Sequence, residues 1–408
     1  MITPTQTILR SPALRLAGFA MLGLGVMNAS VAPYISLVAI ERIGVSEGTY
    51  ALVLVAAAAV AVSSAVLMGV WGDQRGARHM IAALTALASF IGLALMAFAP
   101  SPLALVLCHA FLFPLGSALY GQIFALARLA GPQAPGAADR VLGIIRSGMS
   151  IAFMAMLIFW TFAFGAGVDV MWVYDSALLA ALALSLMVWF LWPRGAEVTW
   201  DDRPSGLNLR EALRELARPL IASRLMMLGA INASAMLYFV LIGLVFEAST
   251  LRDASDIALY VGLVAGWEVP CLILLPRLVA YISRSTLIAV GAAAYGLHVL
   301  LMPIWVDTVW LWAGTLIAGV GGTAFIGLSI TYYQDLLQDR PGAASAMLAL
   351  QKLIADVLGA SAFAIGMAIG GYQTVAIMGF ALTLGGAAAL YWADRTGWLA
   401  GRAPQTVR

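Results

Sequence analysis

Long apolar stretches recur along the whole chain, and they constrain its fold more than any other feature of the sequence. A helix needs about 20 predominantly apolar residues to cross a lipid bilayer. Of the 408 residues, 62% are hydrophobic and only 10% are charged, whereas a water-soluble domain carries about 25% charged residues. We therefore predict an all-α membrane protein with twelve transmembrane helices, over residues 13–40, 49–70, 79–99, 103–127, 141–164, 171–192, 221–246, 256–276, 285–303, 308–333, 343–369 and 374–393.

One break between these stretches is long and polar. Residues 193–220 mix both signs of charge and include LREALRELAR, the pattern of a short amphipathic helix. The other breaks are mostly short. We expect a six-helix bundle over residues 1–192, a linker over 193–220, and a second six-helix bundle over 221–408.

Arginine is distributed unevenly between the two sets of loops. Eighteen of the 22 Lys and Arg residues fall in the termini, the linker and the loops on their side of the membrane. The opposite loops hold Arg42 and Arg252, and the other two, Arg146 and Lys352, lie within predicted spans. Because cytoplasmic loops carry the excess of positive charge, both termini and the linker are predicted to be cytoplasmic.

The loop after the second span carries a recognisable motif. GVWGDQRGAR, residues 69–78, resembles the loop 2–3 motif of the major facilitator superfamily, G-x-x-x-D-R-x-G-R-R. Glutamine and alanine replace two of its usual arginines, at positions 74 and 77. The resemblance implies that the loop gates transport, because its carboxylate can pair in only one of two conformations. The predicted gating residues are Gly69, Asp73, Gly76, Arg78, Arg128 and Arg146.

Further segments narrow the resemblance. VAPYISL (31–37), GQIFALAR (121–128), AGWEVP (265–270), and YYQDL with PGAAS (332–345) are similar to segments of the bacterial sugar efflux transporter family within that superfamily. They keep the same order and cover nearly the whole chain. The resemblance implies a proton-coupled secondary transporter that exports sugars or glycosides by alternating access. It also implies a multi-pass protein of the bacterial inner membrane.

Three charged residues fall near the middle of predicted spans: Glu268, Lys352 and Asp356. A charge at the bilayer centre costs about 2.5–3.5 kcal/mol on insertion scales, so such residues usually have a function. Lys352 and Asp356 are four residues apart on one helix and can pair. A carboxylate in low-dielectric surroundings takes up a proton more readily than one in water. We therefore predict that Glu268, Asp356 and Lys352 couple transport to protons, with Glu268 first as carrier; the alternative is a neutralised pair that only fixes helix packing.

Substrate contacts are expected on the spans that line the central cavity of the superfamily fold, namely 1, 2, 4, 5, 7, 8, 10 and 11. Sugar sites use amides and carboxylates for hydroxyl groups and an aromatic ring for the C–H face. The predicted substrate-binding residues are Asn28, Gln122, Asn232, Tyr238, Trp267, Glu268, Gln334 and Gln351. The amides are the stronger candidates, because a polar group in apolar surroundings is costly unless it is hydrogen-bonded. His298 lies in the peripheral span 9, so we interpret it as structural.

Several other functions remain open or are disfavoured. A drug or amphiphile exporter is the main alternative, since 18 Met and 12 Trp suit such cargo; a non-transporting receptor also fits the fold. Three scattered histidines give an enzyme little support. No metal or cofactor site is expected, because Cys108 and Cys271 lie in apolar runs without metal spacing. With a net charge of +2, the expected partners are a small-molecule substrate, protons and the lipid bilayer, without nucleic acid, and the protein is expected to be a monomer.

Overall fold

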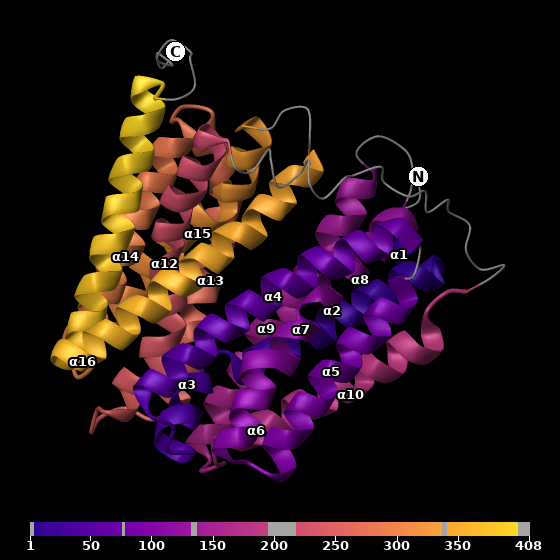
Figure 1. Cartoon of the computed structure of the whole chain (residues 1–408), viewed down its shortest axis with the longest axis horizontal. Coiled ribbons are helices and arrows are strands. Elements are labelled where there is room, and N and C mark those ends of the chain that lie inside the picture. The colour runs from indigo at the N-terminus through magenta and orange to yellow at the C-terminus, as the bar shows by residue number, and fades with distance from the viewer. Residues whose placement is uncertain (1–3, 76–77, 132–136, 195–217, 337–340, 399–408) are drawn as a thin grey trace. The chain divides into compact units, whose positions relative to one another are not determined.

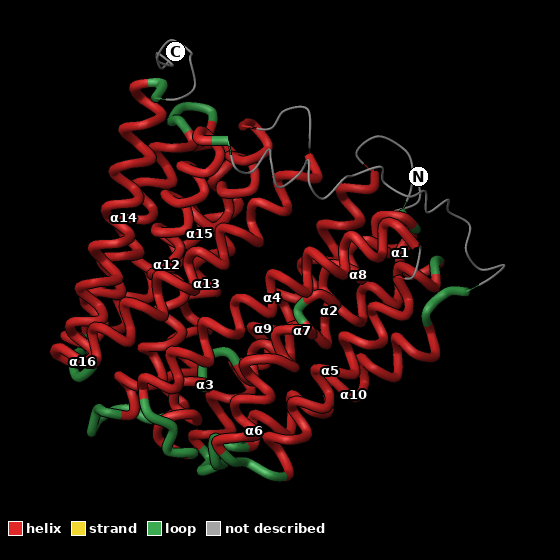
Figure 2. The backbone as a smooth tube through the Cα atoms, in the orientation of Figure 1, coloured by secondary structure: helices red, strands yellow, loops and turns green. Residues whose placement is uncertain are grey.

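Helices make up nearly all of the described chain. The computed structural model describes residues 4–75, 78–131, 137–194, 218–336 and 341–398, and no strand occurs in these segments (Figures 1 and 2). Eleven of the described helices are long and apolar enough to cross a membrane. The predicted class, an all-α membrane protein, is thereby confirmed.

The N-terminal half of the chain contains both short and long helices. Their bounds are α1 Pro4–Arg10, α2 Pro12–Val31, α3 Ile35–Leu37, α4 Glu47–Arg75, α5 Arg78–Phe98, α6 Pro102–Val106, α7 Phe113–Gly116, α8 Ala118–Leu129, α9 Ala137–Gly165 and α10 Trp172–Leu191. Two π-helical turns, Val38–Arg42 and Leu107–Leu112, lie among them.

In the described residues of the C-terminal half, every helix is long. These are α12 Pro219–Glu247, α13 Ala254–Val279, α14 Arg284–Trp305, α15 Trp310–Leu336 and α16 Pro341–Thr396. The last contains two non-helical residues, Gly370 and Gly371, the second with a φ of 74° that glycine adopts without steric cost. The two predicted spans 343–369 and 374–393 are therefore the two arms of α16, and the eleven helices accommodate twelve spans.

Three predicted boundaries differ from the structure. The first span was predicted to run unbroken over 13–40, but α2 ends at Val31, just before Pro33, because proline lacks the N–H that would continue the helix. The fourth, over 103–127, contains a π-helical turn ahead of Pro114. The second continues beyond residue 70 to Arg75, so most of the motif predicted as a loop is helical.

The chain divides into two compact units. The first comprises residues 1–34, 42–44 and 59–207, and the second comprises 35–41, 45–58 and 208–408. The second unit thus includes the short helix α3, which packs against α12: a β-carbon added at Gly243 would lie 2.8 Å from Ser36 Oγ. The predicted linker, 193–220, falls mostly outside the described residues.

In the first unit, a glycine allows two helices to approach closely. A β-carbon added at Gly25 of α2 would lie 2.3 Å from the Met149 carbonyl oxygen of α9. Towards the end of α2, Trp160 Nε1 of α9 donates to Ser30 Oγ of α2 over 3.2 Å. Ser176 Oγ of α10 donates to the same oxygen over 2.9 Å. Close backbone packing and buried hydrogen bonds therefore hold α2, α9 and α10 together.

This packing predicts different effects for two glycines of the same helix. We expect Gly25→Ala to lower the free energy of unfolding by about 1–3 kcal/mol, because the new methyl group collides with backbone. Nothing lies within 4 Å of a β-carbon at Gly18, so Gly18→Ala is the matched control. It should be neutral or stabilising by up to about 1 kcal/mol, from helix propensity alone. Thermal unfolding of both purified variants measures the difference, and equal midpoints would contradict the close contact.

Candidate functional site

Glu268 lies on α13, opposite a run of small residues on α15. A β-carbon added at Gly322 would lie 3.3 Å from Glu268 Oε1, and one at Gly319 would lie 2.4 Å from the β-carbon of Trp267. Thr323 Oγ1 donates to the Gly319 carbonyl over 2.7 Å. These glycines bring α15 close enough to enclose the carboxylate in part. Within the described residues, the Glu268 carboxylate has no hydrogen bond or ion pair.

The predicted pairing of Lys352 with Asp356 is present on the first arm of α16. The distance from Lys352 Nζ to Asp356 Oδ2 is 2.6 Å. The lysine side chain is 69% exposed and the aspartate side chain only 14%. The carboxylate is therefore packed into the unit and neutralised, whereas the ammonium group extends away from it. Glu268, by contrast, is the carboxylate that a proton can neutralise without breaking a pair.

The four candidate amides fall into two kinds. Gln122 on α8 and Gln351 on α16 are both buried, and within the described residues their Oε1 atoms have no hydrogen-bond donor. Asn28 on α2 and Asn232 on α12 are half-buried, and each donates from Nδ2 to the carbonyl four residues earlier, over 2.8 and 2.9 Å. The same contact in the first long helix of each half supports a repeat between the halves. The glutamines retain buried acceptors that a ligand hydroxyl can use.

The remaining predicted substrate-binding residues have different surroundings. Tyr238 is buried in an aromatic cluster, with ring centroids 6.1 Å from Tyr295 and 5.4 Å from His298, which favours a packing role. Trp267 is 42% exposed, so its ring is available to a ligand or to lipid. Gln334 belongs to α15, but its side chain lies outside the described part.

The predicted gating residues are distributed over four helices. Gly69 and Asp73 lie in the last two turns of α4, Arg78 begins α5, and Gly76 lies outside the described residues. Arg128 is exposed in the last turn of α8. Arg146 is exposed on α9, whose candidate membrane span begins at Val141, as the sequence predicted.

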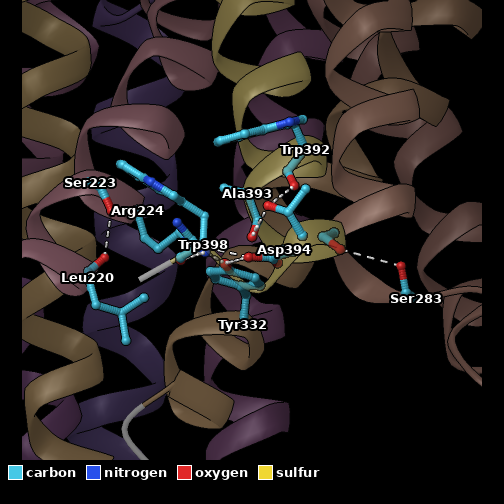
Figure 3. A network of polar contacts seen from close by, with 11 residues as sticks. Leu220, Ser223, Arg224, Ser283, Tyr332, Trp392, Ala393, Asp394 and Trp398 are labelled. Atoms are coloured by element: carbon cyan, nitrogen blue, oxygen red, sulfur yellow. Dashed lines mark hydrogen bonds and ion pairs between the residues drawn. The ribbon is translucent and has the colours of Figure 1, made fainter. Parts of the chain in front are cut away.

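A buried arginine network was missed by the sequence reasoning (Figure 3). Arg224 of α12 is 1% exposed, and its Nε lies 3.0 Å from Asp394 Oδ1 and donates to the Tyr332 hydroxyl over 3.1 Å. The Tyr332 hydroxyl donates to Asp394 Oδ1 over 2.9 Å, and Arg224 Nη2 donates to the Trp398 carbonyl over 3.2 Å. The network joins α12, α15 and α16. The available signal was that Arg224 falls inside the predicted span 221–246.

A second ion pair supports the same end of this unit. Arg284, the first residue of α14, pairs with Asp335 in the last turn of α15. The segment YYQDL therefore contacts two arginines: Tyr332 accepts from Arg224, and Asp335 pairs with Arg284. Together, the two arginine contacts connect four helices of the second unit, α12, α14, α15 and α16.

Comparison with known proteins identifies the family. The sequence pattern of the Major Facilitator Superfamily matches residues 17–360. A Deinococcus radiodurans protein provisionally named a sugar efflux transporter is 26% identical over 393 residues, which cover 92% of this chain and 96% of that protein. Sugar efflux transporter A of Dickeya chrysanthemi is 22% identical over 404 residues, which cover 97% of this chain and 99% of that protein.

Solved structures show the same fold. The nucleoside transporter NupG superposes with a TM-score of 0.74 at 17% identity, over 93% of this chain and 98% of that chain. A POT family transporter in complex with a thioalcohol-conjugated peptide gives 0.74 at 13% identity, over 95% of this chain and 99% of that chain. The expectation that the protein is not an enzyme agrees with these relatives. With its multiple spans and a family match over most of its length, the chain belongs to the Major Facilitator Superfamily of secondary transporters.

Proposed function

We propose that this transporter exports sugars or glycosides across the bacterial inner membrane in exchange for protons, with both termini in the cytoplasm. The observation that carries the proposal is the similarity to two proteins named sugar efflux transporters, over 92% and 97% of this chain. Export as the direction of transport, and the coupling of transport to protons, are parts of the same proposal for this protein.

The described side chains suit this chemistry within each unit. Among the described residues, the Oε1 atoms of Gln122 and Gln351 are buried acceptors without a donor, and a sugar hydroxyl is a donor that satisfies such a group. The exposed ring of Trp267 suits the C–H face of a sugar, and it directly precedes Glu268. Glu268 can then take up the coupled proton, while Asp73 and Arg78 remain the proposed gating residues.

The proposal predicts sugar counterflow in proteoliposomes that contain the purified protein. Labelled lactose or glucoside should accumulate transiently against unlabelled sugar, and other sugars should compete with it. Competition by a hydrophobic cation such as tetraphenylphosphonium, with none by sugars, would favour the drug-exporter alternative and contradict the proposal.

A pair of glutamine variants makes this experiment residue-specific. We expect Gln351→Leu to raise the half-saturating sugar concentration about tenfold, since a hydrogen bond contributes about 1–1.5 kcal/mol. Gln373→Leu is the matched control, because Gln373 lies on the same helix, beyond the break at Gly370 and Gly371, and is not buried. Equal half-saturation in the two variants would remove Gln351 from the sugar site.

A further inference from the structure

The second unit contains a hydrogen-bonded tyrosine–histidine pair, separate from the residues to which the proposed function gives a role. The Tyr260 hydroxyl of α13 and Nε2 of His298 on α14 are 2.8 Å apart, and both side chains are fully buried. The pair lies over α15, where a β-carbon added at Gly314 would be 2.8 Å from the Tyr260 hydroxyl and 3.4 Å from His298 Cδ2. A side chain at position 314 would collide with the Tyr260 hydroxyl, so the glycine leaves the space in which the pair packs.

The polar side chains continue from this pair to Glu268. The rings of His298 and Tyr295 are 5.5 Å apart. A β-carbon at Gly322 would lie 3.3 Å from Tyr295 Cε2 and 3.3 Å from Glu268 Oε1, so both groups flank the same glycine. Gly314 and Gly322 are eight residues apart, two helical turns, and share a face of α15 with the buried Ala318. We call the four side chains that lie against Gly314 and Gly322, namely Tyr260, His298, Tyr295 and Glu268, the polar column.

The other end of the column lies at the start of α13. Asp256 lies four residues before Tyr260 and therefore on the same face of that helix, and Glu268 follows Tyr260 by eight residues, about two turns. Asp256 Oδ2 lies 3.9 Å from Arg252 Nη1, and the Arg252 guanidinium stands 5.4 Å from the centroid of Trp312. The column thus begins at an ion pair on the side predicted to be periplasmic and ends at Glu268.

His298 has the chemistry of a proton relay at the centre of the column. Its Nε2 contacts Tyr260, whereas Nδ1 is buried and has no hydrogen-bond partner within the described residues. Buried polar atoms rarely stay unpaired, and a water molecule is the usual partner where protein supplies none. An imidazole can accept a proton at one nitrogen and release one from the other.

We propose that Tyr260 and His298 relay protons from the Arg252–Asp256 end of the second unit to Glu268. The inference rests on the proposed proton-coupled function. A proton taken up at the Asp256 end reaches the Tyr260 oxygen, the Tyr260 hydroxyl proton passes to His298 Nε2, and the Nδ1 proton passes through water beside Tyr295 to the carboxylate of Glu268. One proton moves in total, and a tautomer change returns the imidazole to its starting state. Tyr260 and His298 are positioning and relay residues, and Glu268 is the carrier.

The other titratable groups near the column do not replace these residues. α12 contributes Tyr238, whose ring centroid lies 5.4 Å from that of His298, and Cys271 lies within electrostatic range of Glu268 on α13 itself. α16 contributes Phe380 and Thr383 beside Gly296, neither of which titrates. Asp253 caps α13; burial would raise the pKa of its carboxyl, but hydrogen bonds from Ser255 and Asp256 lower that pKa below its usual value.

The first unit provides a matched control. His109 Nε2 and the Tyr174 hydroxyl are also 2.8 Å apart, and both side chains are buried. His109→Phe and His298→Phe therefore remove the same kind of contact at a comparable cost in stability. Only the second interrupts the column to Glu268.

The test measures protonation of Glu268 directly, without transport. After a pH jump on purified protein, the infrared carboxyl band that disappears in Glu268→Gln reports the rate. We expect His298→Phe to slow protonation at least about tenfold, since a positioned acid–base group contributes about 10²–10⁴-fold to proton transfer. Tyr260→Phe, which removes only the hydroxyl, should slow it similarly, and His109→Phe should keep the wild-type rate.

The outcomes separate this inference from the proposed function. Wild-type protonation rates in both His298→Phe and Tyr260→Phe would overturn the relay, and so would equal slowing in His109→Phe. If His298→Phe does not fold, Tyr260→Phe decides the question alone. A pH gradient that drives no transport in the wild-type protein would overturn proton coupling, whereas the pH-jump result would still decide whether the column conducts protons.

Discussion

Replacing Glu268 with glutamine is expected to abolish transport driven by a pH gradient and to leave substrate exchange intact. Glutamine keeps the shape and much of the hydrogen-bonding capacity of glutamate but cannot bind and release a proton. Exchange requires only that the loaded protein alternates between its two orientations, so it survives. Proteoliposomes loaded with labelled sugar measure both reactions, with an imposed pH gradient for the first and equal pH for the second.

Asp356→Asn is the control for this prediction, because Asp356 is the other intramembrane carboxylate with a predicted coupling role. Its carboxylate is already neutralised by Lys352 at 2.6 Å, so this variant should keep its coupling. If Asp356→Asn alone uncouples transport, the carrier lies on α16 and Glu268 is a sugar ligand. If both variants lose exchange together with accumulation, the carboxylates bind substrate or hold the helices, and neither carries the proton.

The helical spans could be predicted because the hydrophobicity of each residue can be read directly from the sequence. A run of about 20 apolar residues is enough to identify a span. The structure altered only details, such as the end of α2 at Val31 before Pro33 and the helical extension of α4 to Arg75. The Lys352–Asp356 pair was also accessible from sequence, since four residues on a helix bring two side chains together.

The tertiary contacts of the second unit could not be predicted in this way. Arg224 was counted among the positive residues of the loops, although it falls inside the predicted span 221–246 near the start of α12. Its partners Tyr332 and Asp394 are 108 and 170 residues away, so its burial depends on helix packing that no local pattern records. His298 was interpreted as structural from its span number. Its contact with Tyr260 and the glycines beneath them became visible only in the packed unit.

Removal of the buried arginine should have the largest effect on stability. We expect Arg224→Met to lower the free energy of unfolding by about 3 kcal/mol, because it removes a buried guanidinium and leaves the partly buried Asp394 carboxylate without its cation. Tyr332→Phe removes one hydroxyl from the same network and should cost about 1 kcal/mol. Unfolding of the purified protein in a denaturing detergent measures both values.

Two further variants show whether that loss comes from the stranded charge. Arg277→Met removes an exposed arginine from the last turn of α13, so it should change stability by no more than about 0.5 kcal/mol. The double variant Arg224→Met, Asp394→Leu replaces both charges by apolar groups and should recover much of the loss, since a buried pair contributes little net stability. A double variant as unstable as the sum of its parts would show instead that Arg224 acts through packing. Its aliphatic stem and its contact with Trp398 would then hold α12 to the end of α16.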